Sequence, residues 1–173
     1  MLLKSFISLV IIICCSWIGL IYANSYTERS KLLISMLSSM KMLETEIIYS
    51  ATPLPEILAK VAKKSKKEVG EIFLYTYEIL DKKDGHLFSE AWEKAVMIKT
   101  RHLSLKQDDI DILISIGNNL GISDTNDQIK HISLAMEAIK RSYESSLIGQ
   151  ENNVKLFRNL GILIGITIVI ILI

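Results

Sequence analysis

The sequence contains few of the residues on which disulfide scaffolds and metal centres depend. Its 173 residues include two cysteines, Cys14 and Cys15, and adjacent cysteines supply neither a disulfide framework nor the spacing of zinc ligands. The three histidines, His86, His102 and His131, are scattered and have no acidic or cysteine partner at ligand spacing. We therefore expect neither a structural disulfide nor a bound metal ion.

The sequence also lacks the short motifs of nucleotide and catalytic chemistry. It has no G-x-x-x-x-G-K loop to hold phosphates through its backbone. Glu44 and Glu46 are two positions apart on a predicted helix, so they lie on different faces and cannot form a paired-carboxylate site. The serine, histidine and aspartate residues show no arrangement that indicates a nucleophilic catalytic site. These absences predict a protein that is not an enzyme and that needs no cofactor.

An excess of one charge is missing as well. The chain has 20 lysine and arginine residues and 19 aspartate and glutamate residues, and Lys4 is the single basic residue before the first long apolar run. The remainder of the chain is therefore formally neutral. A neutral domain argues against non-specific nucleic-acid binding, which depends on a basic surface.

The sequence instead has a long apolar run at each end. Ser5 to Ala23 carries no charge, and 160–173 is uncharged behind a polar collar that includes Lys155 and Arg158. Counted from Lys155, the second run is about 19 residues, or roughly 28 Å as a helix, close to one hydrocarbon core. Because such a helix is apolar on every face, it suits lipid. We predict that both runs span a membrane.

A cleaved signal peptide is the alternative for the first run. Lys4 would be its basic start, and Ile21-Tyr22-Ala23 would be its cleavage site. However, the run is longer than the ~7–15 apolar residues of a signal core, and Ile21 is too bulky for the small-residue position. A retained anchor is therefore favoured. The chain divides into an N-terminal transmembrane anchor at 1–24, a soluble domain at 25–154 and a C-terminal transmembrane helix at 155–173.

Basic residues next to the two spans predict which side the soluble domain faces. Arg29 and Lys31 follow the first span, and Lys155 and Arg158 begin the second. Positive residues in short flanks stay on the cytoplasmic side of a membrane. We therefore expect a protein of the cell membrane whose soluble domain is cytoplasmic.

The soluble domain is expected to be all-α. Apolar residues recur at helical spacing throughout, and no segment alternates convincingly between apolar and polar residues. The stripe in the first helix consists of Leu33, Met36, Leu37, Met40, Leu43 and Ile47. We predict a bundle of about six helices: 26–50, which either continues the first span or follows it, a short helix after Thr52, 67–80, 87–100, a helix from Ser104 towards Gly121, and a final helix capped by Ser123 or Asp124.

Local signals mark the ends of these helices. Thr52 has a side chain that can cap a helix, with Pro53 at the first helical position. Ser104 and Gln107 have the spacing of a capping box. Gly121 is suited to a left-handed turn that ends the fifth helix. Trp92, on an aromatic stripe at helical spacing, is expected in the core.

The basic cluster of the soluble domain has two interpretations. It consists of Lys60, Lys63, Lys64, Lys66 and Lys67. One interpretation is a solvated face, and the other is contact with anionic headgroups or with an acidic partner. We retain Lys63, Lys64, Lys66 and Lys67 as candidate partner-binding residues.

A second candidate lies in the C-terminal run, where Gly161 and Gly165 form a G-x-x-x-G motif. Such a motif lets two helices approach closely in lipid. Its partner is either the first span, whose Ser16 and Gly19 offer a small face, or a second copy of the chain, or the span of another protein.

Two passages resemble the stage III sporulation protein AB family. Residues 43–54 fit the pattern L-E-x-E-I-x-Y-x-x-T-P-L, and residues 117–132 resemble G-E-x-L-G-x-x-D-x-x-x-Q-x-x-x-I. The second pattern places Gly117, Gly121, Asp124 and Gln128 in one segment, which we predict to be a shaped partner-binding surface, with helix punctuation as the alternative. Asn118 stands where the family has glutamate, so no role of that carboxylate carries over.

The resemblance implies a setting that composition and periodicity do not. Members belong to the channel complex between mother cell and forespore in endospore-forming bacteria, and they are similar to the six-helix cytoplasmic domains of type II secretion and type IV pilus platform proteins. It implies a platform subunit on the mother-cell side of the outer forespore membrane, with membrane lipid, a cytoplasmic ATPase and other stage III subunits as partners. The alternatives are a membrane-tethered regulatory or ligand-sensing domain and a scaffold that forms homo-oligomers through its spans.

Overall fold

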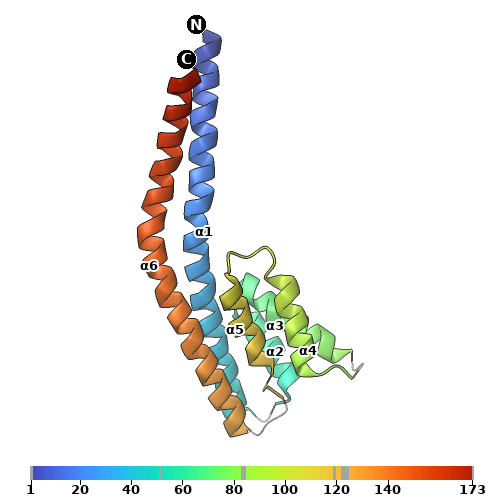
Figure 1. Ribbon diagram of the computed structural model, residues 1–173. Helices are drawn as coiled ribbons and strands as arrows, with labels where there is room; N and C mark the ends of the chain where they lie inside the picture. The colour runs from blue at the N-terminus through green and yellow to red at the C-terminus, as the bar shows by residue number, and fades with distance from the viewer. Residues whose placement is uncertain (1, 51, 83–84, 119, 122–124, 173) are drawn as a thin grey trace. The chain divides into compact units, whose positions relative to one another are not determined.

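Six α-helices make up the computed structural model, which describes residues 2–50, 52–82, 85–118, 120–121 and 125–172. Those residues include no strand, so the predicted all-α class is confirmed. The helices are α1 (Leu2–Tyr49), α2 (Leu54–Lys64), α3 (Lys67–Asp81), α4 (Phe88–Lys99), α5 (Gln107–Gly117) and α6 (Thr125–Leu172) (Figure 1). The first apolar run and the helix predicted at 26–50 are one continuous element.

The chain forms two compact units. The first, here called the terminal hairpin, comprises 1–30 and 145–173, and the second, here called the helical domain, comprises 31–144. The hairpin is longer than the apolar runs because its two helices stay paired beyond them. Tyr26 stacks on Phe157 with ring centroids 5.7 Å apart, and Ser30 donates a hydrogen bond to Gln150 Oε1 at 2.8 Å.

In the helical domain, α1 contributes the stripe that its sequence predicts. Leu33, Met36, Met40 and Leu43 are buried, at the alternating three- and four-residue spacing of a single helical face. From α6, Ile132 and Ile139 join the same core, together with residues of α2, α3, α4 and α5. The two long helices thus enclose the core along with the four short ones.

Trp92 is fully buried in this core, as its stripe predicts. Its ring stacks with Phe88 at a centroid distance of 5.9 Å and meets Phe73 edge-on at 5.3 Å. The indole N–H donates to the carbonyl oxygen of Leu113 at 2.6 Å, which satisfies its one polar atom. Aromatic pairs of this kind add about 0.5–1.5 kcal/mol each beyond the area that they bury. The indole is therefore fixed from three sides.

The start of α2 differs from the prediction by one residue. Pro53 is the N-cap residue, with φ −58° and ψ 145°, and α2 begins at Leu54. Pro55 therefore takes the early helical position expected for Pro53, and Thr52 does not cap the helix. The side-chain oxygen of Thr52 is held by the hydroxyl of Ser50 instead.

The start of α5 also corrects the sequence prediction. Ser104 lies outside the helix, and Lys106 is the N-cap residue. The buried side chain of Asp109 accepts a hydrogen bond from the backbone N–H of Lys106 at 2.9 Å. A carboxylate in the first helical turn is also favoured by the helix dipole. Ser123 and Asp124, the caps expected for the last helix, lie outside the described residues.

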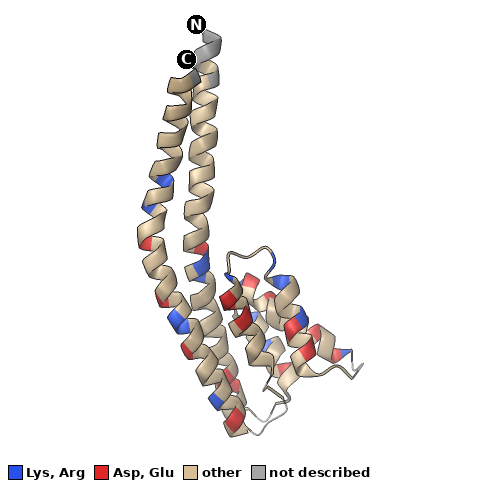
Figure 2. Cartoon of the chain, in the orientation of Figure 1, with Lys and Arg blue, Asp and Glu red and all other residues tan. Residues whose placement is uncertain are grey.

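In the terminal hairpin, α1 and α6 run side by side, with both chain ends at the same end (Figure 1). Each helix contains an 18-residue window apolar enough to cross a membrane, and 11% of each window is buried. The core helix of a soluble protein would be mostly buried instead. Figure 2 shows no Lys, Arg, Asp or Glu along the part of either helix that lies next to its grey end, in keeping with the uncharged runs of the sequence.

Candidate partner-binding groove

The described residues contain no group of three or more histidine, cysteine or acidic side chains that could hold a metal ion. Glu44, a buried carboxylate with a lowered pKa, has a packing role. Its oxygens accept hydrogen bonds from Lys41 Nζ at 2.5 Å and from Ser133 Oγ at 2.8 Å. The hydrogen bond from Lys41 is the main reason that the pKa of Glu44 lies below its usual value. Glu44 therefore stays ionised and joins α1 to α6.

Glu46 has different neighbours, as its place on another helical face predicts. It lies 3.6 Å from Lys60 Nζ and 3.5 Å from Lys64 Nζ, both on α2. Nearer the end of α2, Ser65 Oγ lies 2.7 Å from Ser39 Oγ. Lys60 pairs with Glu46, whereas Ser65, which comes later in the chain than Lys60, pairs with Ser39, which comes earlier than Glu46. α2 therefore runs antiparallel to α1.

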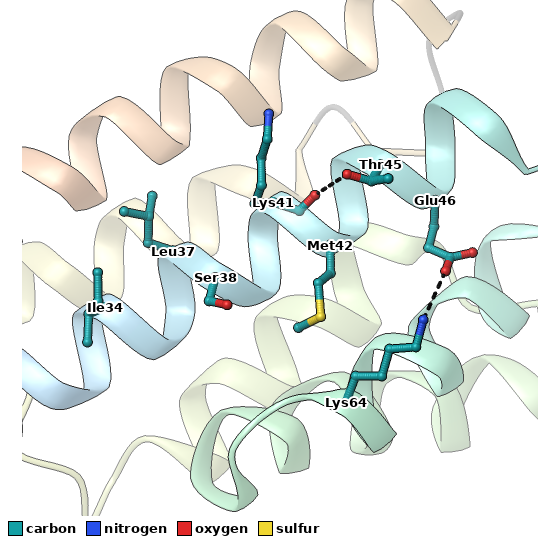
Figure 3. A pocket seen from close by; sticks show the side chains of 8 residues that line it. All are labelled: Ile34, Leu37, Ser38, Lys41, Met42, Thr45, Glu46 and Lys64. Carbon is teal, nitrogen blue, oxygen red and sulfur yellow. Dashed lines mark hydrogen bonds and ion pairs between the residues drawn. The ribbon is translucent and has the colours of Figure 1, made fainter.

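A groove runs along one face of α1, beside the end of α2. Its lining on α1 extends from Ile34 to Glu46, and Lys64, the last residue of α2, is the lining residue that α2 provides. The groove has a volume of about 590 Å³ and is lined by α1 residues together with Lys64 (Figure 3). Its apolar lining consists of Ile34, Leu37 and Met42, and Ile34 is 40% exposed.

The charged side chains of the lining are two lysines and one glutamate. Lys41 and Lys64 lie at the groove, with side chains 69% and 63% exposed. Figure 3 shows Lys64 reaching from α2 towards Glu46, which is the one carboxylate among the lining residues. The remaining lining residues are Ser38 and Thr45. The groove is therefore an open apolar strip with a basic margin.

The basic cluster predicted from the sequence contributes one residue, Lys64, to the groove lining. Lys63 and Lys64 form the last turn of α2, where cations are favoured by the helix dipole. Lys66 and Lys67 follow at the junction with α3, and all four side chains are exposed. The cluster therefore begins where the groove has its α2 wall.

The predicted surface at 117–128 has a different structure. Gly117 is buried, and a Cβ added there would lie 2.8 Å from Trp92 Cδ1, so this glycine is a packing residue and not part of an exposed surface. Gly121 is exposed and has a φ of +82°, which confirms the left-handed conformation, but α5 already ends at Gly117, so Gly121 does not end that helix. Gln128 is half-buried on α6, and Asp124 lies outside the described residues. Gly117 is therefore explained by packing against Trp92, and Gly121 by a turn in the connection after α5.

The G-x-x-x-G motif lies against the first span within the hairpin. A Cβ added to Gly161 would come 2.8 Å from the carbonyl oxygen of Cys15, and one added to Gly19 would come 3.0 Å from Gly161 Cα. For Gly165, the nearest atom would be Ile12 Cα at 3.1 Å. These backbones are too close for larger side chains, as expected for small-residue packing in lipid.

Sequence reasoning did not identify the groove. The helical stripe on α1 was assigned to one buried face, and Ile34 and Met42 lie outside that stripe. Apolar residues on a second face of an amphipathic helix were the available signal. That signal was incomplete, because the groove also requires α2 to lie beside α1 and to place Lys64 in the lining.

Comparisons with known proteins give a consistent result. The chain matches the family described as stage III sporulation protein AB over residues 4–173. It is 31% identical to stage III sporulation protein AB of Bacillus subtilis (strain 168) over 171 residues, which is 99% of each chain. The solved structure of a protein named stage III sporulation protein AB (SpoIIIAB) is similar, with a TM-score of 0.67 and 30% identity. The match covers 72% of the present chain and 98% of the chain in the solved structure. The chain therefore belongs to the stage III sporulation protein AB family, a family of sporulation proteins.

Proposed function

We propose that the chain is a non-enzymatic platform subunit of the channel complex needed for endospore formation. The terminal hairpin anchors it in the outer forespore membrane, and the helical domain docks a cytoplasmic secretion-type ATPase and other stage III subunits. The family membership and the two apolar helices support the anchored sporulation role. The observation that carries the docking role is the open groove on α1, an apolar strip with a basic margin on a packed helical core.

The distribution of positive charge supports a cytoplasmic helical domain. Arg29, Lys31, Lys155 and Arg158 all lie at the inner ends of the two apolar segments. Exporting the helical domain would move these four cations to the side that positive residues in short flanks avoid. The cytoplasmic side is also where an ATPase has access to nucleotide.

The basic residues support an acidic partner in this proposal. Lys63, Lys64, Lys66 and Lys67 are all exposed, and Lys64 lines the groove.

Co-purification tests this function. The full chain, affinity-tagged and extracted from sporulating cells in mild detergent, is expected to bring down the secretion-type ATPase. The control is a chain in which a glycine-serine linker replaces the helical domain and only the hairpin remains. An ATPase that is equally recovered with the control, or that is absent while other stage III subunits are recovered, would refute docking through the helical domain.

A further inference from the structure

The groove on α1 has the dimensions of a helix-binding site. Its lining extends from Ile34 to Glu46, and twelve helical steps of 1.5 Å correspond to about 18 Å. That length matches about three turns of a second helix. Since Lys64 of α2 is part of the lining, the exposed strip lies beside the line along which one helix already packs on α1.

The side chains of the groove favour a partner with an apolar stripe. Ile34, Leu37 and Met42 provide apolar surface from successive turns of α1, which is the spacing that an amphipathic helix recognises. Met42 adds an unbranched, polarisable side chain that adapts to different partner shapes. In Figure 3, Met42 points from α1 to the side on which Lys64 lies. A helix with apolar residues three and four positions apart would bury these three side chains.

The charges around the groove favour acidic flanks on that helix. The lysines at the groove and its α2 wall are Lys41, Lys60, Lys63 and Lys64, and the carboxylates that pair with them are Glu44 and Glu46. Glu44 is buried, and Glu46 is shared by two lysines, so positive charge is in excess at the margin. Complementary charge fixes the register of a bound helix and raises its rate of association.

We propose that this groove binds an amphipathic helix of a partner protein, with an apolar stripe facing Ile34, Leu37 and Met42 and carboxylates facing Lys64 and Lys63. The proposal rests on the proposed function, since it names the kind of partner segment that the platform receives. An extended lipid surface fits less well, because a concave strip bounded by α2 suits a rod-shaped partner. A second copy of the chain would have to offer a helix of the same kind.

Site-specific photo-cross-linking in sporulating cells tests the proposal. The probe is p-benzoylphenylalanine at Ser38 in the groove of the full chain, and the control is the same amino acid at Ser115, an exposed serine of α5. Mass spectrometry identifies the captured peptide. We expect Ser38, and not Ser115, to capture one segment with apolar residues at helical spacing and carboxylates on its flank. Capture of lipid, of a second copy or of nothing would overturn the proposal.

Substitutions at the groove give the second part of the test. Ile34→Glu is expected to lower the cross-linking yield at least tenfold, whereas Leu74→Glu, at a residue of similar exposure on α3, leaves the yield unchanged. Lys64→Glu should also lower it, and the reversal of a carboxylate to lysine in the captured segment should restore it. Equal loss with Ile34→Glu and Leu74→Glu, or a yield that ignores the charge reversals, would contradict the proposal. Circular dichroism of each purified variant checks that it is folded.

The outcomes also separate this inference from the proposed function. If the groove captures an acidic amphipathic segment of a protein other than the ATPase, the groove assignment stands and ATPase docking at this place is refuted. If the ATPase co-purifies with the folded Ile34→Glu variant as well as with the unchanged chain, and the probe at Ser38 captures no helical segment of any protein, the platform function stands and the groove assignment is refuted.

Discussion

Gly117→Ala tests whether this glycine of the family motif serves packing. The added Cβ would lie 2.8 Å from Trp92 Cδ1 and 3.3 Å from Trp92 Cβ. Trp92 has little room to move, because Phe73 and Phe88 flank its ring and Leu113 accepts its N–H. Overpacking of a well-filled core costs about 1–3 kcal/mol, and the higher helix propensity of alanine returns up to about 1 kcal/mol. We expect a net loss of about 1–2 kcal/mol.

The assay is thermal unfolding of the full chain in detergent, followed by circular dichroism. At about 2–6 °C for each kcal/mol in a domain of this size, the Tm should fall by about 2–12 °C. Ser115→Ala, at an exposed position of the same helix, is the control and should leave the Tm nearly unchanged. Combining Gly117→Ala with Trp92→Phe should cost less than the sum of the two single changes, because a smaller ring makes space. An unchanged Tm together with lost partner binding would refute the packing role and restore Gly117 to a recognition surface.

Three further predictions follow from the fold. In a Cys14→Ser background, Gly165→Cys should form an intramolecular disulfide with Cys15 on mild oxidation, because the added Cβ lies 3.3 Å from that of Cys15. The control is Ile162→Cys, at an exposed position. A covalent dimer in place of the internal disulfide would show that the spans pair between copies of the chain. Because the pKa of Glu44 is lowered in the folded chain, its ionised carboxylate contributes fully to the free energy of unfolding above its usual pKa of 4.5. That contribution is lost as the pH falls through the lower pKa of the folded chain. Glu44→Gln should therefore lose about 1 kcal/mol at pH 7 and less at pH 3, measured by urea unfolding, and an equal loss at both would contradict the charged role. Gly121→Ala should destabilise the chain by about 1–2 kcal/mol and Gly121→Asn by less, since φ is +82° there; equal thermal stability of all three would argue against the turn.

Helix identity was predictable because periodicity reports burial directly. The stripe on α1 and the core position of Trp92 both follow from apolar side chains that return to one face every three or four residues. Gly121 was predictable for a related reason, since a left-handed turn has few alternatives to glycine.

Helix starts were less predictable because several residues can satisfy the same free N–H groups. At α5 the sequence offers Ser104, yet the carboxylate of Asp109 reaches back to Lys106 and the helix begins there. The capping-box pattern is read from residue types alone, whereas the acceptor that is used depends on where the preceding loop leaves the chain.

The candidate site was the least predictable part. Glu44 meets Ser133 across 89 residues of sequence, and no local pattern encodes that contact. The groove depends on α2 lying beside α1 and adding Lys64 to a lining in which Ile34 is exposed and Met42 is half-buried. Both features arise from tertiary packing.

The side of the membrane on which the helical domain lies is the measurement on which the platform function depends most. A cysteine replaces exposed Lys94 on α4 in a Cys14→Ser, Cys15→Ser background, and a membrane-impermeant thiol reagent is added to intact protoplasts. The cytoplasmic orientation predicts that this cysteine is protected until the membrane is permeabilised. Labelling of intact protoplasts would place the helical domain outside the cytoplasm, where no cytoplasmic ATPase could dock.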